Sequence, residues 1–200
     1  MINSFRKSLR LPDFDYAQTG AYFITVVTQN RLSLFGTIEN DKMILNDIGK
    51  MIDDVCQELP QFVPSVLFEP YVIMPNHFHA IVLLHMGGVG ATLCGRPARR
   101  VQVRRTQRSA PMGPIENNIN PISLSDVVGR FKSLTTLRFI HGVRKLSWPR
   151  FENRLWQRSF YEHVIRDERD FQCIADYILN NPLNWEKDEE FIKVPNNEVK

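Results

Sequence analysis

The sequence predicts an α+β fold, a ferredoxin-like βαββαβ antiparallel sheet with helices on one face plus a C-terminal helix. The first observation is that strand-like and helical runs follow one another as strand, helix, strand, strand, helix, strand. The second is that only Pro75-Asn76 separates the two middle strands, so these strands should pair antiparallel. The third is a final helical stretch that Pro182 stops. This order of elements is that of the ferredoxin-like unit.

The first half of the chain supplies a strand, a helix and a strand pair. Residues 21–28 are rich in β-branched and aromatic side chains, which is typical of a strand. Apolar residues recur at helical spacing from Ile44 to Leu59, with Asn46 and Asp47 near the start of the helix, and Pro60 is expected to end it. Strands are then expected around residues 66–74 and over residues 77–84, where apolar residues dominate.

The second half supplies a helix, a short strand and the last helix. Residues 123–140 have an apolar stripe at helical spacing, with Ser123 as the expected N-cap. A short strand is expected around residues 156–163. The last helix should begin near Asp167, a good N-cap residue, and its buried stripe is formed by Phe171, Ile174, Ala175 and Ile178.

The composition is that of one globular domain with two polar segments. The chain has 200 residues, of which 43% are hydrophobic and 24% charged, so we expect a single domain over residues 1–185. Residues 86–121 are rich in Arg, Gly and Pro and predict a flexible basic insertion, either a solvated linker or a phosphate-binding arm. Residues 186–200 are expected to form a polar tail. The net charge of +3 is too small to decide whether the chain binds nucleic acid.

Cysteine usage and hydropathy point to a cytoplasmic protein. The three cysteines are widely spaced and include no Cys-x-x-Cys pair, so neither a disulfide framework nor a cysteine zinc site is indicated. The N-terminal residues lack an apolar core of secretory length, and no stretch reaches the roughly 20 apolar residues of a membrane span. We therefore expect no membrane partner.

A pair of histidines marks the strand over residues 77–84. Alternate side chains of a strand share a face, so His77 and His79 should point the same way and could hold one divalent ion or a phosphate. Met74-Pro75-Asn76 predicts a break or bulge just before them. From the spacing alone, a half-exposed surface pair remains an open alternative.

The last helix presents a tyrosine and an amide on one edge. At helical spacing, Tyr177 lies beside the buried stripe and Asn181 follows one turn later. The alternative for Tyr177 is an amphipathic residue that covers the margin of the core. On the helix over residues 123–140, Arg130 and Lys132 are either ordinary solvated charges or a phosphate-facing edge.

Together these two motifs resemble a known family. The strand segment Pro-Asn-His-Phe-His-Ala-Ile-Val (75–82) and the helix segment Asp-Tyr-Ile-Leu-Asn-Asn-Pro (176–182) are similar to those of the HUH single-tyrosine transposases. More narrowly, the chain resembles the REP-associated tyrosine transposases, which are related to the transposases of small insertion sequences. The blocks 20–25, 129–133 and 156–166 also look like that branch.

The resemblance implies a chemistry and a set of site residues. Tyr177 would attack a phosphodiester of single-stranded DNA and form a 5′-phosphotyrosine link with release of a 3′-hydroxyl. His77 and His79 would hold a divalent metal, Mg²⁺ or Mn²⁺, with Asn181 as a third ligand. Tyr161 also precedes a glutamate and a histidine, but it matches a structural block of the family and not its nucleophile.

The resemblance also implies single-stranded DNA as the partner, in the form of a hairpin. The chain would be a single-stranded DNA endonuclease and strand transferase that acts on hairpin or palindromic repeats, as a homodimer or as a monomer. Two alternatives stay open: a metal-dependent phosphodiester hydrolase that uses water, and a non-catalytic protein that binds nucleic-acid hairpins. The basic residues expected to contact DNA are Arg6, Lys7, Arg10, Arg130 and Lys132.

Overall fold

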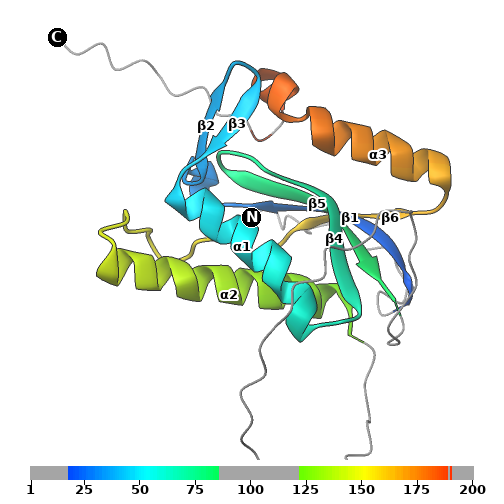
Figure 1. The fold of residues 1–200 in the computed structure, drawn as a ribbon, viewed down its shortest axis with the longest axis horizontal. Helices are drawn as coiled ribbons and strands as arrows, with labels where there is room; N and C mark the ends of the chain where they lie inside the picture. Colours follow the sequence, from blue (N-terminus) through cyan, green and yellow to red (C-terminus); the bar gives the residue numbers. More distant parts are fainter. Residues whose placement is uncertain (1–17, 86–121, 189, 191–200) are drawn as a thin grey trace, which may run out of the picture.

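A four-stranded antiparallel sheet of order β4-β5-β1-β6 forms the centre of the computed structural model, which describes residues 18–85, 122–188 and 190 (Figure 1). This is the strand order of a ferredoxin-like unit, so the predicted fold class is confirmed. The strands of the sheet are β1 (Gly20–Val27), β4 (Val66–Ile73), β5 (His77–Leu84) and β6 (Tyr161–Ile165). The remaining elements are η1 (Gln29–Arg31), the hairpin β2 (Gly36–Glu39) and β3 (Lys42–Leu45), α1 (Asp47–Phe62), α2 (Leu124–Lys145), α3 (Glu168–Asn180) and η2 (Pro182–Lys187).

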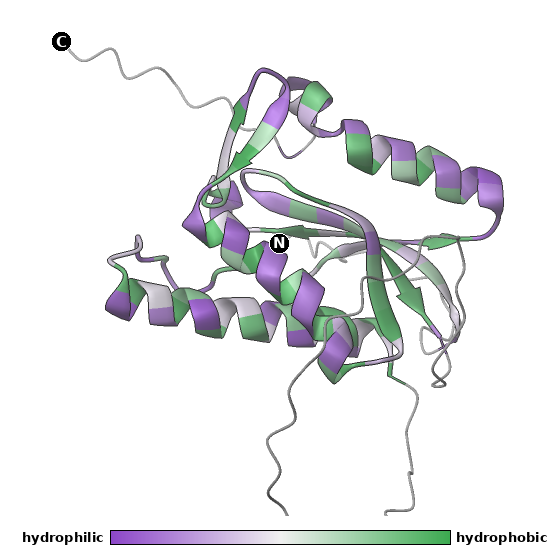
Figure 2. Cartoon of the chain, in the orientation of Figure 1, coloured by the Kyte–Doolittle hydropathy of each residue, from purple (hydrophilic) through white to green (hydrophobic). Residues whose placement is uncertain are grey.

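The helices lie on both sides of the sheet. Helices α1 and α2 pack on one side, and α3 crosses the other (Figure 1). Hydrophobic and hydrophilic residues alternate in bands along these helices, as expected where one side of each helix is buried (Figure 2). The larger core therefore lies between the sheet and the pair α1 and α2, while a smaller apolar cluster lies under α3.

Strand β5 contributes to both sides because its side chains alternate. Phe78 belongs to the large core, whereas Ile81 belongs to the cluster under α3. His77 and His79 share the face of Ile81, and they lie opposite Val27 and Thr25 of the neighbouring strand β1. The sheet thus positions the histidine pair on the side of α3.

The first helix begins near Asn46 and Asp47, as the sequence predicts, but it ends later than predicted. Ile44 lies in β3 and not in the helix, because the Asn46 side chain caps α1 by accepting from the amides of Ile48 and Gly49. Pro60 does not end α1, because the amide of Val63 still donates to the carbonyl of Leu59 and closes the last turn. The short β2–β3 hairpin before this helix is an element that the sequence analysis did not predict.

The second half follows the prediction with shifted boundaries. Ser123 caps α2 through a capping box with Asp126, as expected, but the helix runs on to Lys145. Strand β6 begins at Tyr161, because Trp156 forms only an isolated bridge with Thr28. Asp167 caps α3 as predicted.

The segment 74–76 is a turn held by backbone hydrogen bonds. The Pro75 carbonyl accepts from the amides of Leu34 and Phe35, and the Asn76 carbonyl accepts from the amide of Thr28. The register shift in this strand pair lies instead between Phe68 and Tyr71 of β4. Of the break or bulge predicted at 74–76, the structure therefore shows the break, and the antiparallel pairing is confirmed.

Among the described residues, no helix has the length and apolar character needed to cross a membrane.

Candidate active site

The histidine pair is buried at the surface of the sheet that faces α3. His77 is 0% exposed and His79 is 3% exposed, and their ring centroids lie 4.4 Å apart. A pair of surface histidines would be hydrated, so the half-exposed alternative is wrong. Burying two imidazoles is costly unless they bind something or are hydrogen-bonded.

Asn76 fixes the orientation of His77. The Asn76 amide nitrogen donates to the carbonyls of Arg31 (3.3 Å) and Glu190 (2.8 Å), so its oxygen faces the Nδ1 atom of His77 at 2.8 Å. That oxygen can only accept, so Nδ1 carries the proton and Nε2 keeps its lone pair. Within the described part of the chain, Nε2 of His77 has no hydrogen-bond partner. Its lone pair could therefore bind a metal ion.

His79 is held between β1 and α3. Its Nδ1 atom lies 2.9 Å from the hydroxyl of Thr25, the residue paired with it on β1. Its Nε2 atom lies 3.3 Å from the Tyr177 hydroxyl oxygen. The ring is also stacked on Phe23, at 5.4 Å between centroids. The paired strand and the helix thus fix the ring from both sides.

Helix α3 delivers both residues that the sequence singled out. Tyr177 is 46% exposed, and its hydroxyl reaches the histidine pair. Asn181, just after the helix, is buried, and in the described residues its Oδ1 atom has no hydrogen-bond partner. The phenol, the amide oxygen and the imidazoles therefore converge within one chain.

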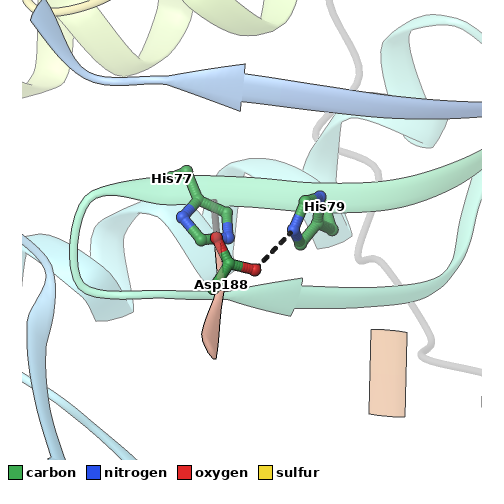
Figure 3. Close-up of side chains that lie close together, drawn as sticks. All are labelled: His77, His79 and Asp188. Carbon is green, nitrogen blue, oxygen red and sulfur yellow. Dashed lines mark ion pairs between the residues drawn. The ribbon is translucent and has the colours of Figure 1, made fainter. Parts of the chain in front are cut away.

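Asp188 is a member of the site that the sequence analysis missed. It follows η2, which brings the chain back over the sheet, and its carboxylate lies between the two imidazoles (Figure 3). Its Oδ2 atom accepts from the Asn181 amide (2.9 Å) and the Tyr177 hydroxyl (3.3 Å), and lies 3.9 Å from Nε2 of His79. The sequence predicts a polar tail over residues 186–200, and only the fold distinguishes Asp188 from the other acids of that segment.

Burial and charge set the protonation of the site. Burial, together with the neighbouring His79, lowers the pKa of His77 to about 3, against the opposing effects of Asp188 and Asn181. Burial would raise the pKa of Asp188, but the neighbouring His79 and hydrogen bonds from Asn181 and the Glu190 amide outweigh this effect and hold that pKa well below its usual range. At neutral pH the site therefore offers a neutral imidazole beside a carboxylate.

This donor set fits a divalent metal ion. Ligand atoms of His77, His79 and Asp188 all lie within 4.8 Å of one another, and the Oδ1 atom of Asn181 is a further oxygen donor nearby. Two imidazoles with a carboxylate suit Mn²⁺ or another transition ion better than Mg²⁺, which prefers oxygen ligands. Two orphaned buried atoms, His77 Nε2 and Asn181 Oδ1, are what an ion would satisfy.

The basic residues predicted to contact DNA lie elsewhere or are not described. Arg6, Lys7 and Arg10, like the insertion 86–121, lie outside the described residues. Arg130 is exposed on α2, on the opposite side of the sheet from the histidines. The Lys132 ammonium donates to three backbone carbonyls that precede β6, those of residues 157, 158 and 159, so it fixes that loop. DNA contact by these residues stays a prediction.

Comparisons with known proteins find similar transposases. A "Putative REP-associated tyrosine transposase" of Haemophilus influenzae is 23% identical over 169 residues, which cover 84% of this chain and 73% of that protein. A solved structure, that of a REP-associated tyrosine transposase bound to a REP hairpin, shares the fold with a TM-score of 0.52 at 20% identity, over 86% of this chain and 72% of that one. The chain is therefore similar to REP-associated tyrosine transposases in sequence and in fold.

A second relative of the chain is more similar in sequence. It is an uncharacterized protein of Haemophilus influenzae, 35% identical over 190 residues that cover 94% of this chain and 93% of that protein. No family model matches the chain. The sequence similarity and the shared fold together support a transposase-like function.

Proposed function

We propose that this transposase-like chain cleaves and rejoins single-stranded DNA through a covalent 5′-phosphotyrosine link at Tyr177, with a divalent metal. The observation that carries the proposal is the convergence at the Tyr177 hydroxyl, which lies 3.3 Å from both His79 Nε2 and Asp188 Oδ2. A nucleophile within reach of its activating groups is the arrangement that covalent catalysis needs.

The chain's own residues prepare the phenol for attack. The Tyr177 hydroxyl donates to the Asp188 carboxylate, which turns an oxygen lone pair away from that acid and toward the open side of the site. A phenol with an ordinary pKa near 10 attacks poorly at neutral pH, so its proton must be lost in or before the transition state. The tyrosine oxygen then bonds to phosphorus as the bond to the 3′ oxygen breaks, and that oxygen leaves as a 3′-hydroxyl after gaining a proton.

His77, His79, Asp188 and the Asn181 side-chain oxygen would hold the metal. When bound, it supplies Lewis-acid stabilisation of charge on the phosphate oxygens. Around it, Asn76 and Thr25 keep the two imidazoles in the ligand orientation. A neutral His77 can bind an ion without first losing a proton at neutral pH.

Strand transfer follows from the intermediate. A phosphotyrosine diester conserves the energy of the broken bond, so a DNA 3′-hydroxyl can attack it and regenerate the free phenol. Joining to a different strand would need no nucleotide cofactor. The named relative with a bound REP hairpin supports a hairpin or palindromic repeat as the DNA substrate.

The site needs no second subunit. Tyr177 on α3 reaches His79 on β5 of the same chain, which supports a monomer as a catalytically sufficient unit. A homodimer that exchanges the tyrosine helix would have to reproduce the same contacts between chains.

The test is a search for the covalent intermediate. The protein is incubated with a fluorescently labelled REP-type DNA hairpin carrying single-stranded flanks, with Mn²⁺, and resolved on a denaturing gel. We expect a labelled protein band that chelator prevents and that Tyr177→Phe abolishes, while hairpin binding persists. Tyr161→Phe is the matched control and should keep the band.

Two outcomes would favour the other function classes. DNA cleavage that survives Tyr177→Phe without a trapped adduct would indicate a metal-dependent hydrolase that uses water. Salt-sensitive binding that neither chelator nor His77→Ala affects, with no cleavage, would indicate a non-catalytic hairpin-binding protein.

A further inference from the structure

A cleft of about 550 Å³ opens beside the Tyr177 phenol, and Tyr161, one of the residues that line it, has no part in the chemistry above. Its sheet side is formed by Phe23, Thr25 and Tyr161, and its other side by residues of η2, including Asn184 and Lys187. A volume of this size is in the range of sites that bind small molecules, so it has room for one nucleotide.

Aromatic rings continue from the nucleophile to this wall. Phe23 of β1 lies 5.9 Å from the Tyr177 ring and 6.1 Å from the Tyr161 ring, in both cases edge to face. Phe23 is buried, whereas Tyr161 is 48% exposed. The buried ring therefore links the attacking phenol to a second aromatic side chain that faces the cleft.

The position of Tyr161 in the sheet explains its exposure. It begins the edge strand β6 and lies opposite Thr25, so it shares the face of His79. At the other end of β6, Ile165 packs into the apolar cluster under α3. Helix α3 thus covers the end of the strand and leaves the Tyr161 ring open.

We propose that Tyr161, backed by Phe23, is the surface on which the nucleobase next to the attacked phosphate stacks. The proposal rests on the function proposed above, because it takes DNA as the substrate and Tyr177 as the neighbouring nucleophile. Every base has a π face, so such a surface holds a nucleotide of any sequence.

The charges around the cleft are compatible with a DNA strand. Lys187 is exposed on the opposite wall and can meet a phosphate. Of the two acids that line the cleft, Glu190 is paired with Arg31, and Asp188 belongs to the proposed metal ligands. An aromatic wall facing a cation is the pairing by which proteins hold single strands.

The surroundings of Tyr161 do not match those of a core residue or of a nucleophile. A core tyrosine would be buried, and among the described residues no hydrogen bond holds the Tyr161 hydroxyl. The ring contact of Tyr161 within the site is with Phe23, while His79 makes its ring contacts with His77, Phe23 and Tyr177. Tyr161 is therefore placed to bind DNA beside the reacting groups.

The experiment is a binding cycle between the side chain and the base. Affinities are measured by fluorescence anisotropy for a labelled REP-type hairpin with single-stranded flanks and for a series in which each flanking nucleotide in turn is abasic. The proteins are the wild type, Tyr161→Phe, Tyr161→Leu and Tyr161→Ala, with Ca²⁺ in place of Mn²⁺ to limit cleavage, and circular dichroism confirms that each is folded.

We expect Tyr161→Ala to weaken binding of the intact hairpin by about 5- to 100-fold. Tyr161→Leu should lose nearly as much affinity, because leucine covers Phe23 but has no π face on which a base can stack. Tyr161→Phe keeps the ring and should bind like the wild type. At one flanking position, an abasic nucleotide should weaken binding by the wild type by a similar factor. The same abasic nucleotide should hardly weaken binding by Tyr161→Ala any further. Lys187→Gln should instead weaken intact and abasic DNA equally.

The proposal is overturned if Tyr161→Ala binds as the wild type does, or if its loss is the same at every abasic position. It is also overturned if Tyr161→Phe loses the covalent adduct, because Tyr161 would then be a nucleophile. Failure of the proposed function is a separate result: no adduct with the wild type and Mn²⁺, whatever the binding cycle shows.

Discussion

The two faces of the central sheet differ in what their side chains do. On the side of α1 and α2, Phe78 is stacked on Phe131 at 4.8 Å within a continuous apolar core. On the side of α3, the neighbours of Phe78 along the same strand are two buried imidazoles that meet a carboxylate. One strand therefore contributes stability through one set of side chains and a site through the alternate set. Substitutions at adjacent residues of β5 should therefore affect different properties, the stability at Phe78 and the activity at His77 or His79.

The largest effect is expected from the site face. His79→Ala removes a proposed metal ligand and the group nearest the Tyr177 hydroxyl, so adduct formation should fall below detection. Titration calorimetry should show that Mn²⁺ binding is lost or strongly weakened. An adduct formed at the wild-type rate would show that the histidines do not act in the chemistry.

The opposite face should respond in stability. Phe78→Ala removes a fully buried ring and should lower the free energy of unfolding by about 3–5 kcal/mol, measured by urea denaturation. Because the phenyl ring lies away from the site, adduct yield per folded molecule should change little. Phe78→Leu, which keeps most of the apolar volume, is the control and should lose less. A variant that is stable but inactive would break the division between the two faces.

The site face should also have its own pH dependence. The pKa of His77 falls from 6.5 to about 3 on folding, so between these values the unfolded chain binds the proton and the folded chain does not. Stability of the metal-free protein is therefore expected to be complete above pH 6.5 and to fall by up to a few kcal/mol toward pH 3.

This pH effect can be assigned to His77 by choosing the window. Asp188, with its lowered pKa, withdraws stability only below its unfolded value of 3.8, so denaturation with chelator above that pH reports mainly on His77. His77→Gln should flatten the profile, and Asp188→Asn should not. An equally steep profile in His77→Gln would place the titrating group elsewhere.

The smallest effect is expected at Thr25, which contacts a proposed metal ligand but is not one itself. Thr25→Val removes the hydroxyl that holds Nδ1 of His79 but keeps the shape of the side chain, so Mn²⁺ affinity should fall by roughly 10–100-fold. Thr25→Ser keeps the hydroxyl and should bind nearly as the wild type. Calorimetric titration of both variants with Mn²⁺ tests whether the Thr25 hydroxyl orients the His79 ring. If Thr25 only buried that ring, Thr25→Val would bind Mn²⁺ as the wild type does.

The sequence predicted the parts of the molecule that local periodicity controls. The alternation along residues 77–84 placed both histidines on one face, and the helical spacing brought Tyr177 and Asn181 to one edge, as the structure shows. It failed at the β2–β3 hairpin, where Ile44 happened to match the helical stripe. Asn40 and Asp41, which have positive φ in that hairpin, were the available turn signal.

Contacts distant in sequence were beyond the reach of such reasoning. Asp188 lies in an acidic stretch in which spacing distinguishes none of the acids, and only the return of the chain after η2 brings its carboxylate to the histidines. Lys132 was similarly ambiguous, because its binding to three loop carbonyls depends on the path of residues 157–159.

The turn at residues 74–76 limits how the gene can change in length. Its carbonyls are engaged by three amides of the segment that follows β1, and His77 comes directly after it. Loss or gain of one codon there would shift β5 by one position and exchange its two faces, so that Phe78 would point toward α3 and an imidazole into the core. Insertions and deletions compatible with a working protein should therefore avoid this turn.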